Sequence, residues 1–211
     1  ENEQCAALMK ILGLQLHAKL TPESVTELRY ARVVILADQD VDGAHIASLT
    51  LNFFHTKWPS LVQAAPDYFQ RFATPLVRVT LPGGGGDMRF FSEVEYERWA
   101  DERVAQGLQT GRSRYFKGLG TSNSLLAREY FRDWERHVIT LRSTGAGCQS
   151  ALDLFFEEGT QAAAARKSFL LDTYDPKAFV DYSASSVTWH EFLYNDMAHY
   201  SAADNVRSIP S

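Results

Sequence analysis

An apolar run that ends in a string of acidic residues constrains this chain more than any other feature. Residues 33–37, VVILA, have strand length and many β-branched side chains, which predicts a strand buried on both faces of a parallel sheet. Residues 38–43, DQDVDG, follow directly, and residues 44–58 carry apolar side chains at helical spacing up to the helix breaker Pro59. The unit is therefore a strand, an acidic turn and a helix.

Asp38, Asp40 and Asp42 alternate along this acidic turn. In an extended segment alternate residues point to one side, so we expect the three carboxylates to converge. Carboxylates held close together raise one another's pKa values, and a hard divalent cation such as Mg²⁺ keeps them ionised. Gly43 then lets the backbone turn into the following helix.

Three interpretations of the acidic turn compete. The simplest is a solvated turn at the end of a strand, where Asp is common. A calcium loop of EF-hand type matches the opening positions, but the twelfth residue from Asp38 is Leu49 instead of Glu, and a strand precedes the loop instead of a helix. Magnesium binding at the carboxyl edge of a parallel sheet agrees with both the position and the chemistry of the residues.

The rest of the chain alternates helical and strand patterns. Helices are predicted at residues 1–12, 22–30, 93–106, 127–138 and 161–171, and a last one is capped by Thr188 and Glu191. Residues 77–81 and 88–91 predict a hairpin, and residues 114–116 a short strand.

Length, charge and hydropathy limit the function classes. A chain of 211 residues has room for one to two domains, and a net charge of −5 means that any DNA contact has to be local. No stretch approaches the roughly 18 apolar residues of a membrane span, so we expect no membrane partner. The chain lacks an initiator Met, and we expect it to be a piece of a longer protein.

Five collinear segments together resemble one family. Residues 37–46, ADQDVDGAHI, resemble the acidic element of the TOPRIM domain in type IIA DNA topoisomerases. Residues 115–122, YFKGLGTS, and 204–211, DNVRSIPS, resemble two further elements of that family, and residues 1–15 and 52–61 resemble its eukaryotic branch, DNA topoisomerase II. The chain is thus identified as a TOPRIM-containing fragment of the DNA-cleavage core of that branch.

The resemblance implies an α/β fold of the TOPRIM type, which is Rossmann-like with a mostly parallel sheet flanked by helices. A helical C-terminal extension would lead toward a winged-helix domain. We expect residues 1–172 to form the TOPRIM domain with its extension, without the family's N-terminal glutamate-containing strand. Residues 173–186 would be a linker, and residues 187–211 would start the winged-helix DNA-cleavage domain.

The resemblance also implies an activity for the parent protein. It would be an ATP-dependent type II topoisomerase that changes the topology of double-stranded DNA by transient double-strand cleavage and strand passage. It would act as a homodimer, in the nucleus by family precedent or in a mitochondrial or other organellar form. The fragment alone is expected to be inactive, because the catalytic Tyr, the upstream Glu and the ATPase domain lie outside it.

Other functions were weighed against this one. A Mg²⁺-dependent phosphohydrolase or phosphotransferase could also use an Asp-x-Asp loop, but it would need a second acidic cluster, and the sequence has none that we recognise. An interaction scaffold is the third alternative.

For the metal site, the resemblance implies that Asp38 and Asp40 bind Mg²⁺ directly and that Asp42 binds it directly or through water. Mn²⁺ or Ca²⁺ would substitute for Mg²⁺, and ATP would belong to the parent protein only. His45 matches a family histidine and would donate a hydrogen bond to a metal-binding carboxylate. A histidine on a helix surface is the simpler alternative.

For DNA binding, the resemblance implies three basic residues. Arg166 and Lys167 match a family pair that contacts DNA, which we expect to occur at phosphates. Solvated charges on a helix explain the same two residues. Lys117 would contact the DNA or the acidic turn from a glycine-rich loop, and a turn that needs glycine for its backbone is the alternative.

Overall fold

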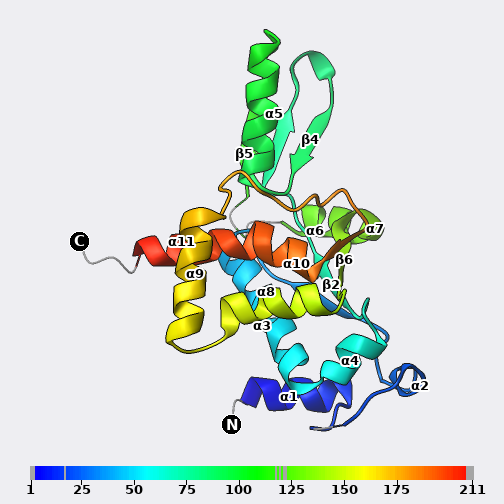
Figure 1. The fold of residues 1–211 in the computed structure, drawn as a ribbon. Helices are drawn as coiled ribbons and strands as arrows, with labels where there is room; N and C mark the ends of the chain where they lie inside the picture. Colours follow the sequence, from blue (N-terminus) through cyan, green and yellow to red (C-terminus); the bar gives the residue numbers. More distant parts are fainter. Residues whose placement is uncertain (1–2, 17, 117, 119, 121–122, 208–211) are drawn as a thin grey trace.

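The computed structural model describes residues 3–16, 18–116, 118, 120 and 123–207, with side chains up to Asp204. Figure 1 shows an α/β body from which an arm, made of a small sheet and one helix, projects. The helices and helical turns are α1 (Glu3–Leu12), α2 (Pro22–Val25), α3 (Val41–Lys57), α4 (Pro59–Ala64), η1 (Pro82–Gly84), α5 (Glu93–Ala105), α6 (Ser124–Arg132), α7 (Trp134–His137), α8 (Ala146–Phe156), α9 (Thr160–Asp172), α10 (Trp189–Phe192), η3 (Leu193–Met197) and α11 (Ala198–Arg207). The strands are β1 (Val33–Leu36), β2 (Phe69–Phe72), β3 (Val77–Thr80), β4 (Asp87–Phe90), β5 (Arg112–Tyr115), β6 (Val138–Arg142) and β7 (Ser186–Thr188).

The body is built on a four-stranded sheet in the order β1-β2-β6-β7. β1 runs parallel to β2 and β6 runs parallel to β7, but β2 and β6 are antiparallel. The α/β class is therefore confirmed, with a sheet that is mixed although mostly parallel. The prediction that β1 is buried on both faces is wrong within the described residues: β1 lies at the sheet edge, and Leu36 is 49% exposed.

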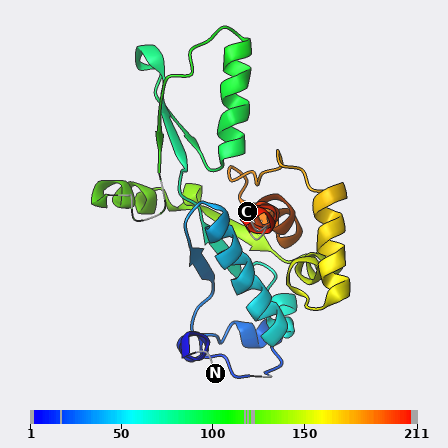
Figure 2. The ribbon, with the colours of Figure 1, turned by 90° about the vertical axis from the view of Figure 1, so that its left-hand side faces the viewer.

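Helices cover both faces of this sheet, and β2 shows how. Phe69 points to one face, where its ring contacts Phe54 of α3 and Trp189 of α10. Phe72 points to the other face and packs against Phe131 of α6 and Trp134 of α7. Because successive strand residues face opposite ways, Phe69 and Phe72, three residues apart, serve two different layers of aromatic packing. Figure 2 shows the body from the side, with the sheet between these helices.

The arm has its own small core. β3 pairs antiparallel with β4 on one side and with β5 on the other. Val77, Val79 and Phe90 are buried against α5, where Tyr96 and Trp99 complete the cluster. The predicted hairpin is confirmed, as is the helix after it, whose N-cap Ser92 accepts a hydrogen bond from the Glu95 amide at 3.1 Å.

Several parts of the body differ from the predictions. The helix predicted at residues 22–30 ends at Val25, and α4, which begins at Pro59, was not predicted. The helix predicted at residues 127–138 ends at Arg132, α7 follows after Asp133, and Val138 already begins β6. β2 and α8 were not predicted at all, because Arg71 interrupts the apolar pattern of β2 and residues 146–156 carry no clear cap. Ser186, the last residue of the expected linker, begins β7, a strand of the main sheet that continues to Thr188. The division into domains stays a prediction.

Across the part of the chain that the structure describes, no helix is both long and apolar enough to cross a lipid bilayer.

Candidate metal-binding turn and its pocket

The acidic turn joins β1 to the N-terminus of α3. Asp40 is the N-cap of α3, and its Oδ1 accepts a hydrogen bond from the Gly43 amide at 2.8 Å. Asp42 lies in the first helical turn. Carboxylates near a helix N-terminus interact favourably with the partial positive charge there, so both side chains stabilise the start of α3. The two aspartates are exposed, whereas Asp38 is half-buried.

Two glycines, Gly43 and Gly118, lie in close contact with Asp38. A Cβ atom on Gly43 would lie 1.8 Å from the Asp38 carbonyl oxygen, so no other residue fits here without a backbone shift. Gly118 has a φ of +75°, and a Cβ atom there would lie 2.6 Å from Asp38 Oδ2. Gly118 therefore lies directly against the Asp38 carboxylate.

Arg71 of β2 fixes the turn from inside the body. Its side chain is only 1% exposed, and Nη2 donates a hydrogen bond to the Asp38 carbonyl oxygen at 3.2 Å. Nη1 donates to Tyr182 Oη at 2.8 Å and to Asp196 Oδ2 at 3.2 Å. A buried guanidinium requires such partners, because an unpaired charge is costly in a low-dielectric interior.

Burial also shapes the electrostatics around Arg71. The pKa of the Tyr182 hydroxyl is raised well above its usual range by burial, and Arg71 opposes the shift only in part. Tyr182 stays neutral and donates a short hydrogen bond to Asp196. The guanidinium also lies 5.2 Å from the centre of the Phe192 ring, a cation–π distance. Arg71, Tyr182 and Asp196 thus connect η3 to the acidic turn.

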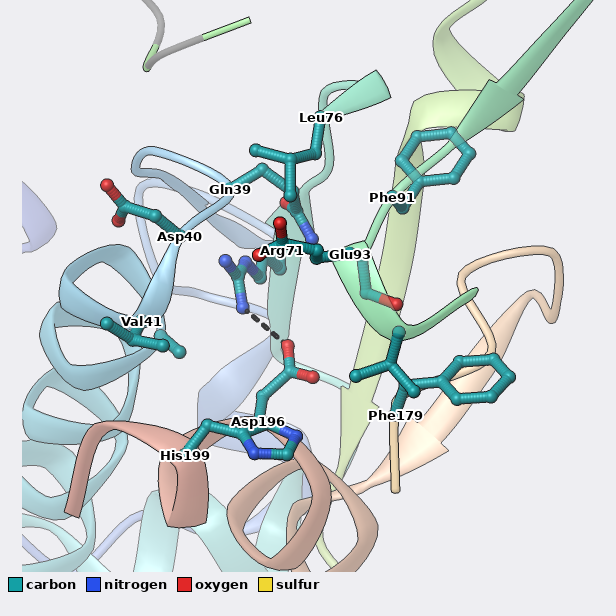
Figure 3. Close-up of a pocket in the computed structure, with 13 residues that line it drawn as sticks. Gln39, Asp40, Val41, Arg71, Leu76, Phe91, Glu93, Phe179, Asp196 and His199 are labelled. Atoms are coloured by element: carbon teal, nitrogen blue, oxygen red, sulfur yellow. Dashed lines mark hydrogen bonds and ion pairs between the residues drawn. The ribbon is translucent and has the colours of Figure 1, made fainter. Parts of the chain in front are cut away.

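A pocket of about 410 Å³ lies beside this network (Figure 3). Its wall includes Gln39 and Asp40 of the turn, Glu93 at the start of α5, and His199 of α11. Gln39 is 8% exposed, and its Oε1 has no hydrogen-bond partner among the described residues. The Asp40 carboxylate turns away from Arg71, as Figure 3 shows, so the two charges do not neutralise each other.

The three aspartates supply the right donor chemistry for a hard cation, but they do not lie on one extended segment. Asp42 is already helical, because Asp40 ends the extended backbone by capping α3. Within residues 3–204, gaps excepted, no group of three Asp, Glu, His or Cys side chains is arranged to hold a metal ion. Metal binding by Asp38, Asp40 and Asp42 therefore stays a prediction.

His45 packs under the C-terminal helix. Its ring stacks on Tyr200 of α11 with 3.9 Å between ring centres. Burial lowers the His45 pKa, and the negative charges of Asp204 and Asp42 counter part of that shift. In the part of the chain that is described, we find no hydrogen bond from His45 to a carboxylate, so its proposed role beside the metal ligands stays a prediction.

The basic residues singled out from the sequence lie apart from the turn or outside the described residues. Arg166 of α9 is half-buried, and its Nη1 donates to the carbonyl oxygens of Leu154 at 3.2 Å and Glu157 at 2.9 Å, at the end of α8. Such contacts satisfy the last carbonyls of a helix. Lys167 is exposed. Lys117 falls outside the described residues.

Sequence analysis missed Arg71, Tyr182, Asp196 and Gln39. Arg71 lies in a strand that was not predicted, and its side-chain partners Tyr182 and Asp196 are 111 and 125 residues away along the chain. Only the strand pairing brings them together.

A family model described as the C-terminal associated domain of TOPRIM matches residues 72–205. Among curated relatives, DNA topoisomerase 2 of Arabidopsis thaliana is 37% identical over 211 residues, and mitochondrial DNA topoisomerase 2 of Dictyostelium discoideum is 36% identical. Each match covers 100% of this chain but only 14% and 16% of the respective relative.

A solved structure matches the fold. The DNA-binding, cleavage and re-ligation domain of Plasmodium falciparum topoisomerase II superposes with a TM-score of 0.85 at 31% identity. The match covers 100% of this chain and 28% of that domain.

Proposed function

The chain belongs to the TOPRIM C-terminal associated family and is similar over its whole length to DNA topoisomerase 2, and from that premise we propose that its acidic turn supplies magnesium ligands to a DNA-cleavage centre. The chain spans about 15% of the length of the curated relatives it matches, so the activity belongs to a larger assembly.

The packing of the acidic turn supports this proposal most directly. Gly43, Gly118 and Arg71 each contact Asp38, through its backbone or its carboxylate. A solvated surface turn needs no such support from two other segments of the chain and from a glycine within the turn itself. A turn that must present carboxylates to a cation in a fixed geometry does, because ligands held in place cost less to order on binding.

Asp38 and Asp40 are the proposed direct ligands, and Asp42 binds directly or through water. The cation would supply positive charge to a DNA phosphate during strand cleavage. The chain's own residues hold the turn: Asp40 caps α3, and Arg71 anchors the Asp38 carbonyl. We propose that further donors from the longer protein complete the site, so the chain by itself binds metal weakly.

The larger assembly would act on double-stranded DNA as an ATP-dependent homodimer, with Arg166, Lys167 and Lys117 near DNA phosphates. It would work in the nucleus or in an organelle; the Dictyostelium and Caenorhabditis elegans relatives are named mitochondrial. The domain boundaries at residues 172 and 186 are part of this proposal.

Calorimetric titration with Mn²⁺, and then Mg²⁺, tests the metal site. The test variant is Asp38→Asn with Asp40→Asn, because Asn removes charge but still caps a helix. The control is Asp101→Asn with Glu158→Gln, which removes the same charge at two exposed positions. We expect weak binding that the test variant loses and the control keeps. Equal binding by both variants would contradict the proposal.

A further inference from the structure

The arm carries a row of arginines on one face of its sheet. In the register of β3 with its two neighbours, Arg78 lies directly opposite Arg89 of β4 and directly opposite Arg114 of β5. Directly opposite residues share a face, so these three side chains form one row across the sheet. Arg112 lies two residues from Arg114 on the same face. The apolar residues of β3 point the other way, toward α5.

Like charges placed directly opposite destabilise a sheet unless something offsets them. Within the row, Arg78 pairs with Asp87, with Nε at 3.0 Å from Oδ2, and Arg89 pairs with Glu129 of α6. Arg112 and Arg114 are exposed, and the described residues place no carboxylate within ion-pair distance of either. The face therefore carries four guanidinium groups and two carboxylates, with the excess positive charge on β5.

This face is hollowed. A groove of about 430 Å³ is lined by Arg78, Arg112, Arg114, Thr80 and Asp87 from the sheet, and by Leu126 from α6. Figure 2 shows α6 at the base of the arm, on the side of the sheet away from α5. Arg114 is held in place by Phe116, with 5.0 Å between its guanidinium carbon and the ring centre. The groove is thus a concave surface with three arginines, of which Arg78 pairs with Asp87 while Arg112 and Arg114 carry the excess positive charge.

One end of the basic row lies near the acidic turn. Gly118 lies against the Asp38 carboxylate and is four residues after Arg114. Four residues span at most about 14 Å, so Arg114 lies within that reach of Gly118. A polyanion whose phosphate lies at the acidic turn would have neighbouring phosphates at this distance.

We propose that the arginine face of the arm binds the phosphodiester backbone of DNA next to the site of cleavage. The inference rests on the proposed function, which places a DNA phosphate at the acidic turn. Arginine suits this partner because its planar fork matches phosphate oxygens in a bidentate way. In a chain with a net charge of −5, the face also provides the local basic surface that DNA binding requires.

Fluorescence anisotropy of a labelled 30-base-pair duplex across a salt series tests the proposal. The test variant is Arg112→Ala with Arg114→Ala. The matched control is Arg98→Ala with Arg103→Ala, which removes two arginines that also lie over aromatic rings but belong to α5, behind the sheet. Two lost phosphate contacts reduce the slope of log affinity against log salt by about 2. We expect that reduction in the test variant and an unchanged slope in the control.

Other results would overturn the proposal. Equal slopes for the two variants would show a general charge effect, and a duplex that does not bind the wild-type chain at all would show that the face has another role. Binding of a polyglutamate peptide as tight as that of DNA, lost in the same variant, would point to an acidic protein partner. The metal titration is carried out without DNA, so its result stands separately from all of these.

Discussion

Arginine has opposite roles in the body and in the arm. In the body, Arg71 is enclosed by Tyr182, Asp196 and the Asp38 carbonyl, and it orders the backbone of the acidic turn. In the arm, Arg112 and Arg114 are exposed on a sheet face. There they are accessible to a binding partner. The same side chain is a structural anchor where it is buried and a contact surface where it is not.

The two regions also differ in how they are stabilised. The body has one continuous core that joins α1, α3, α8, α10 and the four-stranded sheet. The arm relies on a small cluster around Val77, Val79 and Phe90. We therefore expect substitutions of the same kind to cost much more in the body than in the arm.

The largest expected difference comes from removing one arginine in each region. Arg71→Met leaves Asp196 without its cation in a nearly buried site, which should lower the free energy of unfolding by about 3–5 kcal/mol. Arg78→Met breaks a pair with Asp87 that is about one-third exposed, which should cost about 0–1 kcal/mol. Urea unfolding followed by circular dichroism measures both. Equal losses of unfolding free energy in the two variants would contradict the proposed difference between body and arm.

A smaller difference is expected from a methyl group at a glycine. Gly43→Ala would place its Cβ 1.8 Å from the Asp38 carbonyl oxygen, and the resulting shift should cost about 1–3 kcal/mol. Gly147→Ala, in α8, meets no described atom within 4 Å and should be neutral or stabilising. Thermal unfolding of both variants checks this. If Gly43→Ala unfolds at the wild-type temperature, the close contact between Gly43 and the Asp38 carbonyl is contradicted.

The smallest effect is expected from pH. Burial lowers the His45 pKa below its ordinary value of 6.5, so the unfolded chain binds more protons below that pH. Stability should therefore fall as the pH drops below 6.5. His45→Phe keeps the stacking on Tyr200 and should reduce this loss.

The matched control for this effect is His190→Phe, whose ring stacks on Tyr194 at an exposed position. Unfolding curves from pH 7.5 to 5.5 should keep the wild-type pH dependence in this control. Residues 77–115 contain no histidine, so exchange of the arm amides should not follow the same pH dependence. A His45→Phe variant with the full wild-type loss would contradict this assignment.

Local sequence signals were enough to predict the elements that carry the acidic turn and the arm. Thr21 and Ser92 each accept the capping hydrogen bond of a helix, and their side chains need only neighbours three residues away. The cap at Asp40 was missed, because the helix was expected from residue 44 and begins at Val41. The hairpin of β3 and β4 likewise depends on alternation and a glycine-rich turn. Features of this kind are determined by residues within a short segment of the sequence.

The missing features depend on contacts that are distant in sequence. Arg71 is compatible with a strand only because Tyr182 and Asp196 arrive from the far end of the chain to pair with it. Val138 belongs to β6 instead of a helix because the strand pairs with β2. The exposed edge of β1 also depends on the sheet order, which no local pattern reveals.

The central claim is that the acidic turn binds a divalent cation, and site-resolved NMR tests it most directly. A ¹⁵N-labelled chain is titrated with Mn²⁺, which broadens the amide signals nearest to it. We predict that the amides of residues 38–44 and Gly118 broaden first, and that Asp38→Asn with Asp40→Asn abolishes this selectivity. Broadening that begins elsewhere, such as at Glu157 and Glu158, while residues 38–44 stay sharp would contradict the claim.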